Sequence, residues 1–337
     1  MDLNNLEKAV LATIAYYDAL DFPLTGFEVF EYLINPVRLI SAENQFSEIE
    51  PINKIALKDV LGILNSRNLS FYLGEKNGFY FLKNKEHLIE TRIMRQKISG
   101  QRWKKVRKII KYLQIVPFIK MVAISGSLAM DNVKQESDID LFIIAKNKRV
   151  WTTRFFTTLF FQIIGQRRYG KKIENRFCLN HYITDKSLKI NFRSLANAQT
   201  YSHLVLVLEI EQGIYNKFQK QNDWIKDYLY AYHPQKLNSQ RKIKTGSFLR
   251  FFAKIREFIL NSFLGLILEK ILGFFQKKLI QRHYLNLKGR GRIIVDETQL
   301  EFHPDAQEAK ILDKYNTNML RLGFKTQELD SGLTSKK

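Results

Sequence analysis

The chain of 337 residues contains a single cysteine, Cys178, and only six prolines. One cysteine cannot form an internal disulfide or a metal site built from cysteines alone, and such scarcity favours a reducing compartment. The N-terminal residues lack the basic segment and apolar run of a signal peptide, so we expect a cytoplasmic protein. Hydrophobic residues at 45% and charged residues at 26% are the proportions of a folded globular protein, which argues against disorder along the whole chain.

Acidic residues are also scarce, because 33 Asp and Glu stand against 54 Lys and Arg, a formal net charge of +21. The excess is concentrated in residues 84–114, with ten basic and two acidic residues, and in residues 236–292, with fourteen and two. Such a field attracts polyanions, so nucleic acid, nucleotide phosphates and anionic lipid are candidate partners. A Lys-rich surface that is simply solvated would explain the same numbers.

Long apolar runs are missing as well. In the basic segment 248–280 the longest apolar stretch, residues 258–268, has eleven residues and includes Asn261 and Ser262, whereas a bilayer span needs about 20. We therefore expect no transmembrane span. Apolar and basic residues are interleaved through 248–280, which indicates either a helix packed on the rest of the protein, the interpretation that we favour, or a basic amphipathic helix on an anionic membrane.

The N-terminal quarter has the pattern of three helices followed by a hairpin. Apolar spacing predicts an amphipathic helix over 3–20, Thr25 and Glu28 have the spacing of a capping box that opens a second helix, and a third helix is expected over about 53–66. Asn77-Gly78 between two β-prone runs predicts a tight turn. This order resembles a winged helix, whose third helix enters the DNA major groove; we favour the alternative of a packing or protein-contact module.

The boundaries of two helices in this part of the chain are predicted from turn residues. Asn35-Pro36 is expected to end the second helix and to begin a polar loop. Residues 85–113 predict a long basic helix, which Ser99-Gly100 could break in two and which Pro117 ends. This helix would connect the first domain to the second.

The motif that carries chemistry follows the apolar run 119–124, where Gly126-Ser127 opens a short helix. A polar loop then leads to Asp138-Ile139-Asp140 and a second apolar run. Side chains at i and i+2 of a strand share a face, so Asp138 and Asp140 point the same way. Two close carboxylates repel each other unless a cation lies between them, and oxygen ligands are those that Mg²⁺ prefers.

Gly126-Ser127 and Asp138-Ile139-Asp140, with Ser137 before the pair, resemble the signature of the nucleotidyltransferase superfamily related to DNA polymerase beta. The resemblance implies metal-assisted transfer of a nucleoside monophosphate from a nucleoside triphosphate to a hydroxyl, with release of pyrophosphate. Asp138 and Asp140 would hold two Mg²⁺ ions, and Gly126 and Ser127 would bind the nucleotide phosphates. The alternative interpretation is a surface loop with two solvated aspartates.

A third carboxylate on a later strand is usual in that family, and this chain departs from the pattern. The next strand-like run, residues 176–184, contains no acid. Glu174 and Asp185 flank it and are candidate substitutes, with Glu174 slightly preferred. Asn180 could bind metal through its carbonyl oxygen, and His181 could accept a proton, although an ordinary half-buried histidine is the simpler interpretation of His181.

The remaining pattern indicates an α+β fold with a nucleotidyltransferase-like mixed sheet and flanking helices. A Phe-rich helix over 150–165 ends in the basic cluster 167–172, which could hold phosphates or be a solvated helix end.

We expect an Mg²⁺-dependent nucleotidyltransferase; the alternative is a catalytically degenerate regulator that binds nucleic acid through its basic helices. The predicted segments are a winged-helix-like domain (1–84), a basic connecting helix (85–117), a nucleotidyltransferase core (118–193), a helical C-terminal region (194–330) and a frayed tail (331–337).

Overall fold

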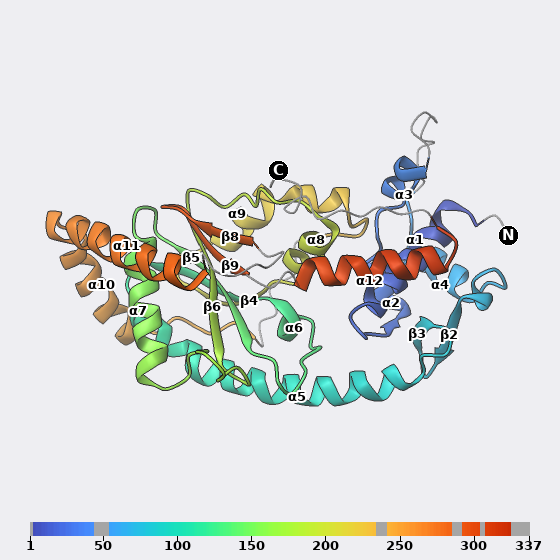
Figure 1. Ribbon diagram of the computed structural model, residues 1–337, viewed down its shortest axis with the longest axis horizontal. Helices are drawn as coiled ribbons and strands as arrows, with labels where there is room; N and C mark the ends of the chain where they lie inside the picture. Colours follow the sequence, from blue (N-terminus) through green and yellow to red (C-terminus); the bar gives the residue numbers. More distant parts are fainter. Residues whose placement is uncertain (1–2, 44–53, 234–240, 285–291, 304–306, 325–337) are drawn as a thin grey trace.

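The computed structural model describes residues 3–43, 54–233, 241–284, 292–303 and 307–324. Within them an N-terminal helical part with a small sheet is joined to a larger sheet by one long helix (Figure 1). The predicted tail, 331–337, and the start of the expected third helix at residue 53 lie outside the described residues. The N-terminal elements are α1 (Asn5–Asp18), β1 (Leu24–Thr25), α2 (Gly26–Glu31), α3 (Pro36–Glu43), α4 (Leu57–Leu64), the 3₁₀ turn η1 (Leu69–Phe71), β2 (Leu73–Lys76) and β3 (Phe79–Leu82).

Helix α1 is buried on all sides instead of on one face. Every residue from Ala9 to Asp18 is buried, because α3, α4, β3 and the C-terminal helix α12 (Gln307–Arg321) all pack against it. The predicted amphipathic helix is therefore the core helix of this part of the protein. Asp18, the last residue of α1, forms an ion pair with Lys85, with 2.6 Å between Oδ2 and Nζ.

Local turn chemistry was predicted correctly at two places and wrongly at a third. Thr25 and Glu28 form the expected capping box at the start of α2, and Asn77 and Gly78 have the positive φ angles, 57° and 75°, of a tight hairpin turn. The polar loop expected after Asn35 is instead α3. Proline is well suited to the first position of a helix, because the missing N–H has no partner there anyway.

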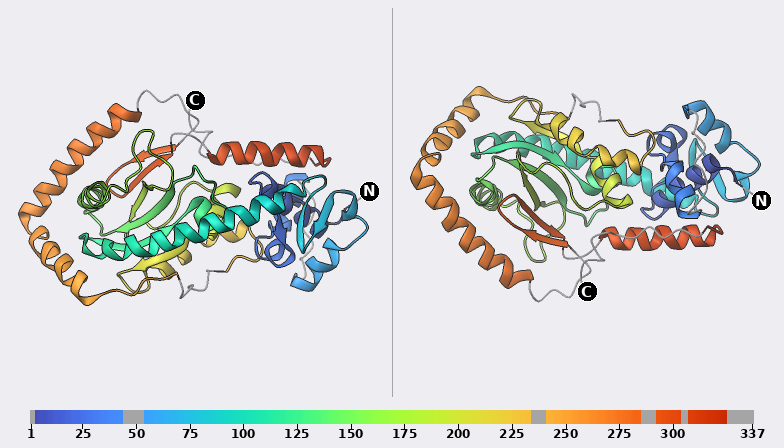
Figure 2. Two further views of the ribbon diagram at one scale, coloured as in Figure 1. Left: turned by 90° about the horizontal axis from the view of Figure 1, so that it is seen from below. Right: turned by 90° about the horizontal axis from the view of Figure 1, so that it is seen from above.

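Helix α5 (His87–Ile110) runs without a break from the N-terminal sheet along the larger sheet (Figures 1 and 2). The predicted break at Ser99-Gly100 is wrong. Ser99 is fully buried and its hydroxyl donates to the carbonyl of Arg95 one turn earlier, which keeps this position within the helix. The helix ends in the 3₁₀ turn η2 (Lys111–Ile115).

The larger sheet has six strands in the order β7-β4-β5-β6-β9-β8. Strands β5 and β6 are parallel, with helix α7 (Val150–Ile163) in their crossover, and the other neighbours are antiparallel. This mixed sheet with flanking helices agrees with the expected α+β class. Its strands are β4 (Ile119–Ile124), β5 (Ile139–Ala145), β6 (Phe177–Thr184), β7 (Val205–Glu209), β8 (Arg292–Val295) and β9 (Gln299–His303), and the four-residue helix α6 (Gly126–Ala129) follows β4.

The C-terminal region was expected to be helical except for a strand at residues 293–295, which β8 confirms. The expectation is wrong for β7 and β9, which are also part of the larger sheet. The run 205–209 is buried on both faces of its strand, and a short buried strand cannot be distinguished from a buried helix by periodicity. The helices of this region are α8 (Leu195–Ser202), α9 (Ile214–Gln221), the 3₁₀ turn η3 (Asp223–Asp227), α10 (Ser247–Leu260), α11 (Phe263–Tyr284) and α12.

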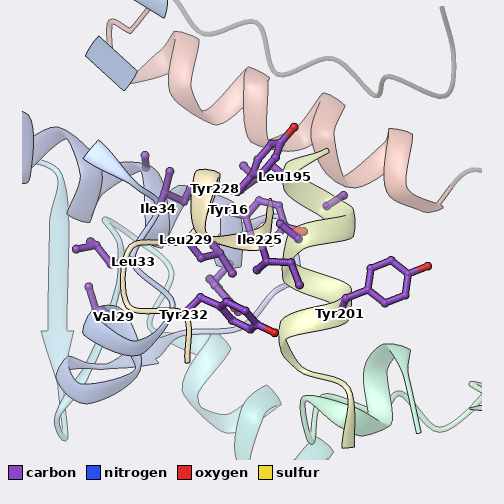
Figure 3. Packing of buried hydrophobic residues seen from close by; sticks show 14 of the residues in the cluster. Tyr16, Val29, Leu33, Ile34, Leu195, Tyr201, Ile225, Tyr228, Leu229 and Tyr232 are labelled. Carbon is purple, nitrogen blue, oxygen red and sulfur yellow. The ribbon is translucent and has the colours of Figure 1, made fainter. Parts of the chain in front are cut away.

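One hydrophobic core joins the N-terminal part to the larger sheet. Tyr16, Val29 and Leu33 of the N-terminal part belong to the same buried cluster as Leu195 and Tyr201 of α8, as Figure 3 shows. A shared core of this kind holds the two parts in a fixed arrangement. The long helix α5 therefore packs along a single rigid unit and is not a flexible linker between two domains.

Candidate active site

The structure brings Asp138 and Asp140 together at the start of β5. Asp140 lies opposite Cys178 in the parallel β5–β6 pair. The two carboxylates and the Cys178 sulfur each offer an atom within 4.8 Å of the others. The predicted pair is therefore one compact group of acidic side chains, and both side chains are partly buried.

Gly126 packs directly on the carboxylate of Asp140. Its φ of 65° lies in the left-handed region, and a Cβ at this position would lie 2.7 Å from Asp140 Oδ2. Only glycine meets both conditions without strain. The N–H of Ser125 donates to the Asp140 carbonyl at 3.1 Å, and Ser127 follows Gly126 in α6, so the Gly-Ser turn and the aspartate pair form one site.

Electrostatics at the pair are dominated by two carboxylates and one arginine. Burial, and then the charge of Asp138, raise the pKa of Asp140. Arg168, from the basic cluster before β6, places Nη1 2.8 Å from Asp138 Oδ2 and donates to the Cys178 sulfur at 3.3 Å. Burial, and then the charge of Asp140, raise the pKa of the Cys178 thiol, which keeps it protonated and neutral.

Asn180, one of the residues considered in place of a third carboxylate, lies beside Asp140. Its amide Nδ2 donates to Asp140 Oδ1 at 3.0 Å, and the residue is 8% exposed. Its Oδ1 is buried and has no hydrogen-bond partner among the described residues. A buried oxygen without a donor is unusual and needs an explanation.

Neither acidic substitute for the third carboxylate lies in this group. Glu174 is exposed and accepts a hydrogen bond from Gln135 at 2.6 Å. Asp185 pairs with Lys120 at 2.6 Å and lies beyond the other end of β6, where its N–H bonds to the carbonyl at the end of β5. Because β5 and β6 are parallel and the aspartate pair is at their start, the proposal of Asp185 as a ligand is wrong.

His181 belongs to a second cluster, with Glu301 and His303 of β9. Burial lowers its pKa to about 4, so it is neutral at physiological pH. Its Nε2 lies 4.0 Å from Glu301 Oε2, and His303 Nε2 lies 3.8 Å from Glu301 Oε1. Arg292 neutralises Glu301 at 2.7 Å, which makes this cluster an ion-pair network more than a cation site.

Glu301 and His303 on β9 are functional candidates that the sequence analysis missed. His303 Nδ1 lies 3.5 Å from Asn180 Nδ2, so β9 reaches the site. The alternation of Leu300 and Phe302 with these two polar residues is the period-2 signal of a half-buried strand. That signal could have predicted β9, although not its pairing with β6.

Helix α5 holds the loop that carries Asp138. Arg102 is 3% exposed, and its guanidinium donates to the carbonyls of Ser137 at 2.5 Å, Gln135 at 2.5 Å and Lys134 at 3.1 Å. Arg92 and Arg95 of α5 are buried as well and bind groups of the N-terminal part and the loop after α6, including Glu28, the carbonyl of Leu20, and Asn132. These arginines are structural and do not contribute to the solvated basic surface that the sequence suggested.

Residues 107–202 match the family model described as Polymerase beta, Nucleotidyltransferase. The matched segment includes β4, α6, β5 and β6, and with them the Gly-Ser turn, Asp138 and Asp140. No curated protein and no solved structure matches the chain. The family match supports a domain of the nucleotidyltransferase superfamily, with the general transferase function and nucleotide substrate of that superfamily.

Proposed function

We propose that the protein is an Mg²⁺-dependent nucleotidyltransferase that transfers a nucleoside monophosphate from a nucleoside triphosphate to an acceptor hydroxyl. The observation that carries the proposal is the pairing of Asp138 with Asp140 under the left-handed Gly126, inside the segment that matches the family. A solvated surface loop would not place Gly126 against one of its carboxylates. The proposed location is the cytoplasm, where nucleoside triphosphates are available.

The residues at the site fit a divalent cation. Nucleotidyltransferase domains generally use such ions. Asn180, which contacts Asp140 through its amide N–H, also carries a buried Oδ1 without a partner among the described residues, and this oxygen could serve as a third ligand. Hard oxygen ligands suit Mg²⁺, whereas the neutral thiol of Cys178 does not. Asp138, Asp140 and Asn180 are therefore the proposed ligands.

In the proposed reaction the acceptor oxygen forms a bond to the α-phosphorus. The bond from that phosphorus to the oxygen that bridges the α- and β-phosphates breaks, and pyrophosphate leaves. Mg²⁺ held at the site would neutralise phosphate charge and increase the acidity of the acceptor hydroxyl, whose proton passes to solvent. Gly126, without a side chain, leaves room for phosphate oxygens beside Ser127. Arg168 can exchange its contact with Asp138 for the triphosphate, because guanidinium binds both carboxylate and phosphate.

A catalytically degenerate protein that binds nucleic acid is the second candidate, and several features of the structure favour it. The side chain of β6 that bonds to Asp140 is the amide of Asn180 and not a carboxylate, and Arg168 already neutralises Asp138. The order α1, β1, α2, α3, α4, η1, β2, β3 also resembles that of a winged helix with one additional helix, α3. The exposed polar residues near α4 and along α5 that could meet phosphate are Lys58, Asn65, Arg67, Lys97, Lys104, Arg107, Lys108 and Lys111.

The discriminating experiment incubates the full chain with each radiolabelled nucleoside triphosphate and Mg²⁺, with and without cellular RNA, DNA and protein. Labelled product that disappears with EDTA and in Asp140→Asn supports the transferase. Glu174→Gln is the matched control, because this exposed carboxyl lies outside the aspartate group. Nucleic-acid binding that is equal in Asp140→Asn, without product from any triphosphate, supports the degenerate alternative and contradicts the transferase.

A further inference from the structure

Helices α10 and α11 expose large apolar side chains and use polar ones to contact the protein, whereas ordinary surface helices do the reverse. Several of their polar side chains face the body of the protein: Glu257 accepts the N–H of Phe118 at 2.9 Å, and Glu269 accepts the N–H groups of Trp151 and Thr152, both at 2.8 Å. Gln276 donates to the Trp151 carbonyl at 3.0 Å. These hydrogen bonds and a few buried or partly buried apolar residues, Ala253, Leu272 and Ile280, attach the helices to the protein, and most of their large apolar side chains are exposed.

The outward side of the two helices is strongly apolar. Fourteen of the 28 exposed large hydrophobic residues in the described part of the chain lie on these two helices, and Phe258 is 83% exposed. Soluble proteins rarely expose contiguous apolar patches of more than a few hundred Å², and larger ones mark protein or membrane contacts. We call this side the outer face; its residues are Phe248, Phe251, Phe252, Ile255, Phe258, Ile259, Phe263, Leu264, Leu266, Ile267, Ile271, Phe274, Phe275 and Leu279.

The charges that accompany the outer face are all positive. Lys254, Lys270, Lys278 and Arg282 are exposed on the same helices. The only acids in the described residues of α10 and α11 are Glu257 and Glu269, which are committed to inward hydrogen bonds. The outer face thus offers aromatic and aliphatic side chains together with unopposed cations.

Helices α10 and α11 meet at a bend of 92° around one end of the molecule (Figure 2). They form the outer layer at the end of the molecule away from the N-terminal part (Figures 1 and 2). Within the described residues no single helix is long and apolar enough to cross a membrane. Only the helices Ser247–Leu260 and Phe263–Arg282, taken as a pair, have the length and composition of a span, and they are bent by 92°. Helices of this kind lie in the interface of a bilayer, with the apolar side at the acyl boundary and Lys and Arg at the headgroups.

We propose that the outer face of α10 and α11 binds the surface of an anionic lipid bilayer. Apolar burial would supply affinity, and the four exposed cations would select membranes with negative headgroups. A second copy of the chain is a poorer occupant, because it would bring the same cations against one another. This inference does not depend on the proposed transferase activity.

The test is flotation of the full-length protein with vesicles of phosphatidylcholine alone and of phosphatidylcholine mixed with phosphatidylserine. We expect flotation with the mixed vesicles and little with the neutral ones. Replacing Phe258, Phe263 and Leu264 together by serine should lower the bound fraction at least about tenfold, because each large side chain contributes strongly when buried. Phe71→Ser, at another exposed aromatic in the N-terminal part, should leave binding unchanged.

A second variant tests the electrostatic part of the proposal. Replacement of Lys254, Lys270 and Lys278 by glutamate should abolish flotation with anionic vesicles, whereas the same charge change at Lys58, Lys97 and Lys108 should not. Circular dichroism confirms that each variant is folded. Equal binding to neutral and anionic vesicles overturns the proposal. So does failure to float when light scattering shows a dimer that the serine variant dissociates, since the outer face would then be an interface between two copies.

Discussion

Asn180 donates its amide N–H to Asp140 Oδ1 across the β5–β6 pair, at an N···O distance of 3.0 Å. The amide stabilises a carboxylate that is crowded by Asp138, and it does so without adding negative charge. The charge repulsion between the two carboxylates is therefore offset by the Arg168 guanidinium and by the hydrogen bond from the Asn180 amide. A cation at the site would use the same oxygen atoms that these groups now contact.

Replacing Asn180 by aspartate tests this compensation. The variant loses the N–H donor and places a third carboxylate in the group, so we expect it to lose about 1–3 kcal/mol of stability in EDTA. Mg²⁺ should recover more stability in this variant than in the wild type, because three carboxylates bind the ion more tightly. Thermal melts with and without Mg²⁺ measure both effects. An equal Mg²⁺ response in the two proteins would place the ion elsewhere.

Asp140→Asn should be more stable than the wild type at neutral and higher pH, by about 1–2 kcal/mol. The raised pKa of Asp140 means that the folded state holds its proton more tightly than the unfolded chain does. Ionisation therefore costs stability as the pH rises above the ordinary aspartate pKa, and the asparagine variant avoids that cost. The gain should shrink as the pH falls toward 4 and vanish well below it, where Asp140 is protonated in both states of the wild type. Melting temperatures across pH check the sign, and a gain that grew on acidification would contradict the assignment.

Gly126→Ala should abolish nucleotide transfer and destabilise the protein by about 1–3 kcal/mol, because the new Cβ meets Asp140 Oδ2 at 2.7 Å and the φ of 65° is strained for alanine. Gly100→Ala is the matched control. Gly100 lies within α5 with nothing within 4 Å of an added Cβ, so this change should stabilise the helix by about 0.5–1 kcal/mol and keep activity. Urea denaturation and the transfer assay measure the two variants.

The exposed and the buried basic residues of α5 should have different effects on nucleic-acid binding and on stability. If nucleic acid binds this helix, reversing the exposed Lys97, Lys104, Arg107 and Lys108 should reduce the salt slope of binding by roughly three to four units, at about 0.9 for each duplex phosphate. Arg102→Met should instead lower the melting temperature, since it leaves three carbonyls of the Asp138 loop without donors, and should leave the slope unchanged. Fluorescence titrations over a range of salt separate the effects. An unchanged slope after the fourfold reversal would exclude α5 as the contact surface.

The predictable part of the site was the part specified locally. Gly126, Ser127, Asp138 and Asp140 lie within fifteen residues of one another, and strand geometry alone places the two carboxylates on one face. The roles of Asn180 and Glu301 depend on which strands become neighbours, and β9 joins β6 from far along the chain. Nothing in the local pattern around residue 301 specifies that pairing.

The same distinction applies to the fold and to the charge. Capping residues and the Asn-Gly turn were predicted because their chemistry is local, whereas the burial of α1 and the strand β7 are decided by what packs on them. Arg92, Arg95 and Arg102 look like surface charges in the sequence. They are buried because carbonyls and carboxylates from other segments satisfy their guanidinium groups, and such partners are known only from the fold.

The central claim is that this protein transfers a nucleoside monophosphate, and the position of the label tests it most directly. Wild-type protein with Mg²⁺ is incubated in parallel with the reactive nucleoside triphosphate labelled at the α-phosphate and with the same nucleotide labelled at the γ-phosphate. We predict that the α-label enters the acceptor, that the γ-label appears in pyrophosphate, and that both signals are lost in Asp140→Asn. Transfer of the γ-label to the acceptor, or product formation that persists in Asp140→Asn, would contradict the account.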